Sequence, residues 1–152
     1  MVMALATRAW TVEDLETLPD DGNRYEVVRG QLLVTPSPSF GHQALVSAIH
    51  VLLANYLARD GMALAFVAPG DVRFGRKDQV QPDVFVIPVA LVTPDITWYN
   101  APKPIIVIEV LSNSTRRRDL GVKRDLYMAR GIPEYWIVDG PNREVKIGRA
   151  HV

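Results

Sequence analysis

The strongest constraint on the fold of this chain is an unbroken apolar run at residues 105–111, which reads IIVIEVL. Its length and β-branched composition predict a strand, and the lack of polar alternation predicts a central strand covered on both faces. One acid, Glu109, interrupts the run. Burial of an isolated carboxylate costs several kcal/mol, so Glu109 needs a partner: a metal ion, a proton or a cationic side chain. A functional site, an internal pair with Arg or Lys, and a strand end that reaches solvent all remain open.

Composition places the chain among globular proteins. The 152 residues are 48% hydrophobic and 22% charged, which predicts one domain over residues 1–152 and excludes global disorder. The absence of cysteine excludes a disulfide framework and a thiolate zinc site. The longest apolar stretch, residues 104–111, is far shorter than the roughly 20 residues of a membrane span, and residues 1–10 lack a signal peptide's apolar core. We therefore expect a cytoplasmic protein with no membrane association.

Charge is balanced overall but unevenly distributed. The chain has 17 basic and 17 acidic side chains, and this neutrality argues against a protein that coats nucleic acid by bulk electrostatics. Residues 103–152 nevertheless hold 10 basic and 6 acidic side chains, and three arginines are consecutive at Arg116, Arg117 and Arg118. Such a run is usually a solvated helix face, and here it is also a weak indication of anion binding.

Turn residues and hydrophobic periodicity predict an α/β (α+β) domain with a central mixed β-sheet flanked by helices, preceded by an N-terminal β-hairpin. Thr11 and Asp14 have the spacing of a capping box for a short first helix. The tail at 148–152 does not complete an obvious hairpin. The predicted helices cover residues 11–16, 42–59 and about 115–130, and the predicted strands cover 24–28, 31–34, 63–68, 71–74, 84–87, 105–111 and 134–139, with a further strand starting at 144.

A second acid, Asp83, directly precedes the predicted strand at 84–87. Carboxylates on neighbouring strands can hold Mg²⁺, which prefers hard oxygen ligands and needs only one or two of them. Such an ion can polarise a phosphoryl oxygen and acidify a water molecule. Lys123 lies on the helix that follows the Glu109 strand, so chain connectivity keeps it near. Its amine could position water at the site, and an ordinary surface lysine is an equally good interpretation.

Taken together, the motifs resemble the PD-(D/E)XK nuclease superfamily, and in particular its bacterial Uma-type family of restriction endonucleases. The resemblance covers most of residues 24–139, and its order and spacing are more specific than any single piece. The matching stretches are RYEVVRG at 24–30, PSP at 36–38 followed by GH at 41–42, QPDV at 81–84, IEVLS at 108–112, DLGVK at 119–123 and GIPEYWIVD at 131–139.

The resemblance implies a restriction-endonuclease-like core, in which the helix at 42–59 precedes three strands, a second helix and a fourth strand. It implies that Asp83 and Glu109 bind Mg²⁺ or Mn²⁺, and that the protein hydrolyses phosphodiester bonds of nucleic acid, DNA in particular, as a homodimer. One position departs from the superfamily pattern. The E-x-K motif would place lysine at 111, where this chain has Leu111, so the catalytic role passes to Lys123 on the following helix.

Further residues are candidates for accessory roles. Glu26 in the early hairpin could approach the metal, although an exposed strand glutamate is the simpler interpretation. His42, at the start of a helix, could contact a substrate phosphate or merely cap and pack. Tyr127 shares a helix face with Lys123, and we interpret it as a packing residue. Asp139 is interpreted as a turn residue. The three arginines at 116–118 would contact backbone phosphates.

The leading hypothesis is a metal-dependent endonuclease with Asp83, Glu109 and Lys123 as its catalytic residues. Asp83 and Glu109 hold the ion, and Lys123 positions or activates water and helps to stabilise the charge that develops on the phosphoryl group. One alternative is a catalytically inert module on the same fold that binds nucleic acid or protein, which the leucine at position 111 and the neutral net charge support. A second alternative is a phosphodiesterase that uses the same ion on nucleotides or other small molecules.

Overall fold

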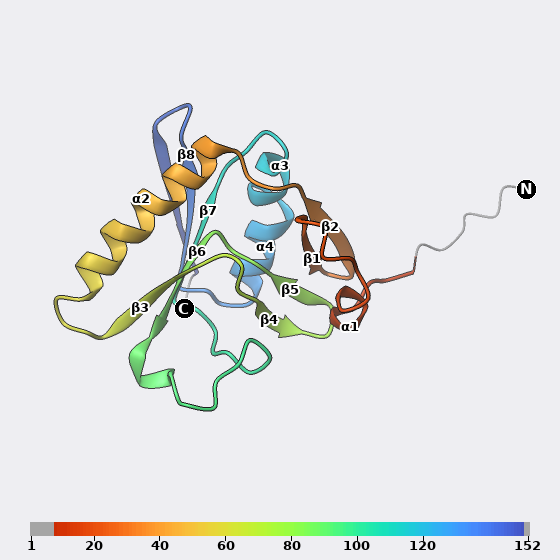
Figure 1. The fold of residues 1–152 in the computed structure, drawn as a ribbon, viewed down its shortest axis with the longest axis horizontal. Helices are drawn as coiled ribbons and strands as arrows, with labels where there is room; N and C mark the ends of the chain where they lie inside the picture. The colour runs from red at the N-terminus through yellow and green to blue at the C-terminus, as the bar shows by residue number, and fades with distance from the viewer. Residues whose placement is uncertain (1–7, 151–152) are drawn as a thin grey trace, which may run out of the picture.

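The computed structural model describes residues 8–150 and contains two β-sheets with helices around them (Figure 1). Five strands form a mixed sheet in the order β3-β6-β7-β8-β9, and four form an antiparallel sheet in the order β2-β1-β5-β4. The elements are α1 (Val12–Leu15), β1 (Arg24–Val28), β2 (Gln31–Thr35), α2 (Phe40–Leu57), β3 (Ala63–Val67), β4 (Val72–Gly75), β5 (Asp78–Val80), β6 (Val84–Pro88), η1 (Val89–Leu91), β7 (Ile106–Val110), α3 (Arg116–Asp119), α4 (Val122–Ala129), β8 (Glu134–Asp139) and β9 (Glu144–Arg149).

The apolar run forms the central strand that its sequence predicts. β7 pairs with β6 in antiparallel and with β8 in parallel orientation, so the five-stranded sheet is mixed. Ile108 and Val110 point to one face, where they pack against Leu45 and Ile49 of α2. Val107 points to the opposite face, which packs against α4 and the four-stranded sheet. Because side chains alternate along a strand, Glu109 lies on this second face.

The early hairpin connects the four-stranded sheet to the segment before β6 of the five-stranded sheet. Arg29 and Gly30 connect β1 and β2 with φ values of 50° and 77°, which is the twist that a two-residue hairpin turn requires. Arg24 and Glu26 share one face of β1 because they are two residues apart. Arg24 donates a hydrogen bond to the Gln81 carbonyl at 2.9 Å, and the Gln81 N–H donates to Glu26 at 2.7 Å. These contacts fix the segment that leads into β6.

Three features differ from the sequence-based expectations. The helix expected at 115–130 is two helices, α3 and α4, which meet at Gly121, where a Cβ atom would lie 2.9 Å from the Arg117 carbonyl oxygen. The segment at 71–74 belongs to the four-stranded sheet rather than the central one, because β5, a short polar strand that periodicity does not reveal, pairs with β4 and β1.

The expectation that the tail completes no hairpin was also wrong. β9 pairs with all six residues of β8, from Glu134 opposite Arg149 to Asp139 opposite Glu144. Its mixed polar and apolar residues suit an edge strand, which lacks the continuous apolar signal of a central one. Residues 1–7, which include most of the segment inspected for a signal peptide, and residues 151–152 lie outside the described part of the chain. Within residues 8–150, no helix is long and apolar enough to cross a bilayer.

The hairpin turn provides a test of this fold. Gly30→Ala should lower the free energy of unfolding by about 1–2 kcal/mol, because an L-residue resists positive φ and the new Cβ would lie 3.2 Å from Ala9 Cβ. Gly41→Ala is the control: Gly41 lies in the first turn of α2 with open space around it, so stability should stay constant or rise by up to about 1 kcal/mol. Urea denaturation of both variants measures the difference, and equal effects would contradict the turn geometry.

Candidate active site

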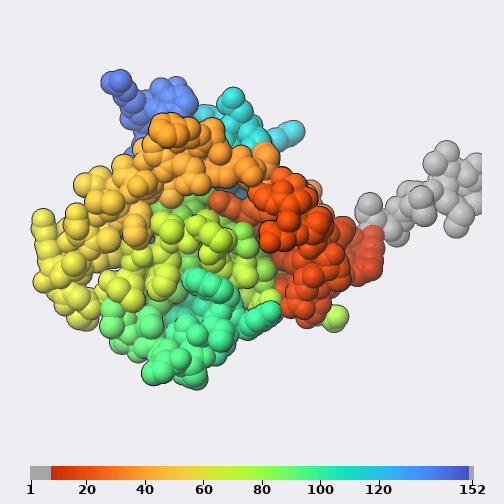
Figure 2. All heavy atoms as spheres, viewed as in Figure 1, coloured from red at the N-terminus to blue at the C-terminus, as the bar shows by residue number. Residues whose placement is uncertain are grey.

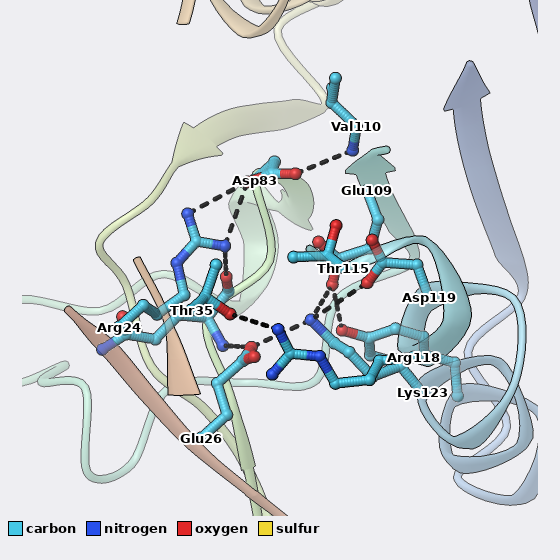
Figure 3. A network of polar contacts seen from close by, with 12 residues as sticks. Arg24, Glu26, Thr35, Asp83, Glu109, Val110, Thr115, Arg118, Asp119 and Lys123 are labelled. Atoms are coloured by element: carbon cyan, nitrogen blue, oxygen red, sulfur yellow. Dashed lines mark hydrogen bonds and ion pairs between the residues drawn. The ribbon is translucent and has the colours of Figure 1, made fainter. Parts of the chain in front are cut away.

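A cavity of about 590 Å³ opens where the hairpin, the start of α2, the end of β7 and helices α3 and α4 meet. Four buried carboxylates and four cationic or titratable nitrogen groups line it. Figure 3 shows how several of them converge from β1, β7 and the two helices. The charged and titratable residues at its centre are Arg24, Glu26, His42, Asp83, Glu109, Arg118, Asp119 and Lys123.

Lys123 lies inside the molecule and not on its surface, with 3% of its area exposed. Its Nζ is 2.5 Å from Glu109 Oε1, 3.0 Å from Glu26 Oε1 and 3.9 Å from Asp119 Oδ1. The position follows from α4, whose inward face consists of Lys123, Leu126 and Tyr127. Burial alone would lower the pKa of Lys123, but the three carboxylates outweigh it and hold that pKa above its ordinary value.

Glu109 is fully buried beside this ammonium group. The Tyr127 hydroxyl donates a second hydrogen bond to the same Oε1 atom at 2.8 Å. Burial raises the pKa of Glu109 to about 8; the Lys123 charge opposes the rise, and the charges of Asp119, Asp83 and Glu26 add to it. Tyr127, which the sequence suggested only as a packing residue, therefore also contacts the acid at the centre of the cavity.

Asp83 is held by a different set of partners. Both terminal nitrogens of Arg24 lie 3.1 Å from its Oδ1, and the Val110 N–H donates to its Oδ2 at 2.8 Å. His42 Nε2 lies 3.3 Å from Oδ2 and 3.0 Å from the Val110 carbonyl. Burial raises the pKa of Asp83, but His42 and Arg24 outweigh it and lower the pKa below its ordinary value. The hydrogen bond between His42 and Asp83 also raises the pKa of His42, although partial burial of the ring lowers it.

Two residues of the cavity were missed by sequence reasoning. Asp119 sits in a basic run that looked like a solvated face, yet it is buried, and burial raises its pKa. Its spacing of four residues before Lys123 was the available signal, since i, i+4 residues share a helix face. Arg24 is two residues before Glu26 and therefore shares its strand face, which is the corresponding signal for Arg24.

The three consecutive arginines do not form one surface. Arg116 pairs with Asp139 at 2.8 Å, away from the cavity lining. Arg117 is exposed. Arg118 alone lines the cavity, and it donates hydrogen bonds to the Val34 carbonyl at 3.1 Å and to Thr35 Oγ1 at 3.3 Å. The expectation that all three arginines contact backbone phosphates stays a prediction, and Arg118 is the one of the three that lines the cavity.

The position of the superfamily's usual lysine is filled by an apolar side chain. Leu111 is buried in the main core, on the face of the sheet that also contains Val107. An ammonium group nevertheless lies against Glu109, because α4 folds back over this face and brings Lys123 to it. The lysine that lies against Glu109 therefore comes from the following helix and not from position 111.

The donor set fits a hard divalent cation in charge and in chemistry. Four buried carboxylates, those of Glu26, Asp83, Glu109 and Asp119, face two permanently charged cations, Arg24 and Lys123. This leaves a surplus of negative charge that a proton or a metal ion can offset. Within residues 8–150, no three acidic or histidine side chains form a ready-made metal cage. Mg²⁺ needs only one or two carboxylates, because water completes its shell.

Comparison with known proteins identifies the family. The Uma2 family model, described as "Putative restriction endonuclease", matches residues 12–151. The chain belongs to the Uma2 family. Among solved structures, a protein from Anabaena variabilis ATCC 29413, described as "a putative nuclease belonging to DUF820", shares its fold with a TM-score of 0.77; it is 20% identical, and the alignment covers 93% of this chain and 80% of that one. None of the curated proteins matches this chain.

These findings confirm the resemblance to the Uma-type family and the mixed α/β restriction-endonuclease-like fold. A family of this description has a nuclease-like function with nucleic acid as its substrate class. The Uma2 match extends from α1 through β9, so it includes every residue that lines the cavity.

The raised pKa of Glu109 predicts a pH-dependent stability in metal-free buffer. The folded-state pKa of Glu109, about 8, exceeds its unfolded value of about 4.5. The folded protein therefore binds this proton more tightly, and the free energy of unfolding that this supplies is fully present below pH 4.5 and is lost as the pH rises through 8. Glu109→Gln should therefore gain stability relative to the parent protein between pH 5 and pH 8, by roughly 1–3 kcal/mol. Glu144→Gln, which changes an exposed glutamate, should show no such trend. Urea denaturation with a chelator at both pH values tests this, and parallel pH profiles would contradict it.

Proposed function

We propose that this protein is a divalent-metal-dependent endonuclease that hydrolyses phosphodiester bonds of DNA. The observation that carries the proposal is the placement of Asp83 and Glu109 on one cavity beside the Lys123 ammonium group. The pairing of Val84 with Ile108 makes Asp83 and Glu109 the next opposed pair along β6 and β7. Opposed residues of an antiparallel pair lie close enough to share one ion.

In this proposal Asp83 and Glu109 hold Mg²⁺ or Mn²⁺, and Glu26 is an accessory acid. The bound ion would supply polarisation of the phosphoryl oxygen and a water of lowered pKa. Arg24 and His42 orient the carboxylate of Asp83, and Tyr127 orients that of Glu109 through the contacts described above. Positioning of this kind fixes the geometry of ligands and their basicity.

Lys123 acts in this scheme as a fixed positive charge. Its raised pKa keeps the amine protonated at neutral pH, so it is poorly suited to accept a proton from water. A protonated amine beside the metal ligands can instead stabilise negative charge that develops on the phosphoryl oxygens. Of the roles that the sequence suggests for Lys123, the raised pKa therefore disfavours activation of water and favours stabilisation of charge.

Substrate contacts would fall at the rim of the cavity. Arg118 lines the cavity and is partly exposed, so it is the candidate for a backbone phosphate. The four carboxylates below it would repel a phosphate until a divalent cation offsets their charge. The family description, a restriction endonuclease, favours DNA over RNA and over small phosphodiesters, and a homodimer would supply one such site for each strand of a duplex.

Cleavage of plasmid or short duplex DNA with Mn²⁺ or Mg²⁺ tests the proposal. Asp83→Asn, Glu109→Gln and Lys123→Met should each lower the cleavage rate by about 100-fold or more, because each removes a ligand or the stabilising charge. Asp125→Asn and Arg124→Met, which change exposed residues of α4, should cleave at the parent rate. Activity that survives in the first three variants would refute the site. Cleavage of RNA or of a model phosphodiester at a higher rate than cleavage of DNA would show that DNA is not the preferred substrate.

Metal binding can be measured apart from activity. Saturating Mg²⁺ or Mn²⁺ should raise the melting temperature of the parent protein, since a ligand at 100 times its dissociation constant adds about 2.7 kcal/mol to the free energy of unfolding. Asp83→Asn should lose this shift, whereas Asp125→Asn should keep it. Tyr127→Phe retains the packing and should weaken the metal affinity by about 10-fold. A parent protein that shows no thermal shift would favour the catalytically inert binding module. That alternative is supported by the contacts of Arg24, His42 and Val110 with both carboxylate oxygens of Asp83.

A further inference from the structure

Helix α2 has a composition that a solvent-exposed helix rarely has. Its 18 residues, FGHQALVSAIHVLLANYL, contain no aspartate, glutamate, lysine or arginine along a length of about 27 Å. A surface helix normally opposes its apolar stripe with a charged face, and a helix that is apolar on all sides is normally covered on all sides. The composition of α2 is therefore that of a helix with two packed faces.

Only one of those faces is covered within the described chain. Leu45, Val46, Ile49 and Leu53 pack on the five-stranded sheet. The opposite side of the helix lies on the outside of the molecule along its whole length, as the orange to yellow spheres of Figure 2 show. Its large side chains are strongly exposed, with Phe40 at 91%, Leu52 at 71%, Tyr56 at 63% and Val51 at 52%. The other exposed residues of this side are small or uncharged and include Gln43, Ala44, Ser47, Ala48 and Asn55.

Strand β9 extends this apolar surface. Val145 and Ile147 pair with Val138 and Trp136, which pack against α2, so all four side chains lie on the helix side of the sheet. Both β9 residues are more than half exposed. We use the term α2 face for the outer side of α2 together with these two residues.

We propose that the α2 face binds the α2 face of a second copy of this chain, with the two helices antiparallel across a two-fold axis. An interface of this symmetry brings the patch against its own copy, so a charge near the two-fold axis would meet a like charge, and this helix carries none. The antiparallel arrangement also places the helix dipoles in opposite directions. Ala44, Ser47 and Ala48 are small enough to allow the helix axes to approach to about 8–10 Å.

The size and chemistry of the α2 face both favour this occupant. Its six exposed apolar side chains, two of them aromatic, offer an area on the order of the ~800 Å² per partner that a specific interface buries. Nucleic acid would require basic side chains, and a helix that lies on a lipid surface carries lysine or arginine on its polar side. α2 has neither.

The same helix reaches the candidate active site. Ser39 caps α2, and Ser39 and His42 line the cavity, so a paired α2 would hold two cavities in a fixed relation. The use of this arrangement to cut two strands rests on the proposed function, whereas the interface itself does not. An Asp83→Asn variant that remains a dimer but no longer cleaves DNA would show that the interface is independent of the catalytic function.

Light scattering on a size-exclusion column measures the mass of the particle. The parent protein should be a dimer at micromolar concentration, and Leu52→Glu should be a monomer with an unchanged circular dichroism spectrum. Leu91→Glu, which places the same charge at an exposed leucine of η1, should remain a dimer. A monomeric parent protein, or a dimer that survives Leu52→Glu, would overturn the proposal.

The absence of cysteine from the chain permits a second, geometric test. Ala48 lies at the middle of α2, so an antiparallel pair would bring it next to its own symmetry mate. Under mild oxidation, Ala48→Cys should form a covalent dimer on a non-reducing gel, because a disulfide needs Cα atoms about 4.4–6.8 Å apart. Ala90→Cys, an exposed alanine outside the α2 face, should stay a monomer on that gel. Equal cross-linking of both variants, or of neither, would refute the antiparallel pairing.

Discussion

The ammonium group of Lys123, buried between the carboxylates of Glu109 and Glu26, is the interaction on which the rest of the structure depends. It joins α4 to a strand from each of the two sheets, β7 and β1. Any one of these charges would cost several kcal/mol if it were buried alone, and removal of one partner from a buried pair typically costs 3–5 kcal/mol. The hairpin, the central strand and the last helix are therefore held together by a group of charges that are stable only as a set.

This set is not neutral. Four buried carboxylates contact two permanent cations, Arg24 and Lys123, and burial raises the pKa values of Glu109 and Asp119, with the neighbouring carboxylates adding to the rise. Asp83 has a lowered pKa because Arg24 and His42 lie against it. Neighbouring acids with pKa values displaced in opposite directions are typical of functional sites, because fold stability alone favours fewer buried charges.

The zero net charge of the chain conceals this local organisation. Basic and acidic side chains are equal in number, yet four buried acids line one cavity and α2 carries no aspartate, glutamate, lysine or arginine. One end of α2 contributes His42 to the cavity, and its outer side remains apolar. A single helix thus contributes to a polar site at one end and presents an uncharged, mainly apolar surface along its outer side.

The sequence by itself determined the central strand, the hairpin, the long helix and the identity of Asp83, Glu109 and Lys123 as candidates, because an acid in an apolar run and turn residues at fixed spacing are local signals. It could not decide whether Lys123 points inward, why Asp119 is buried or that Arg24 holds Asp83, since these facts depend on contacts between residues 59 to 97 positions apart or on the packing of α4. α4 begins directly after Gly121, and Lys123 and Tyr127 on its buried face contact Glu109 of β7. Only the tertiary structure, through the low dielectric and close packing of the interior, converts these separate charges into one interacting site.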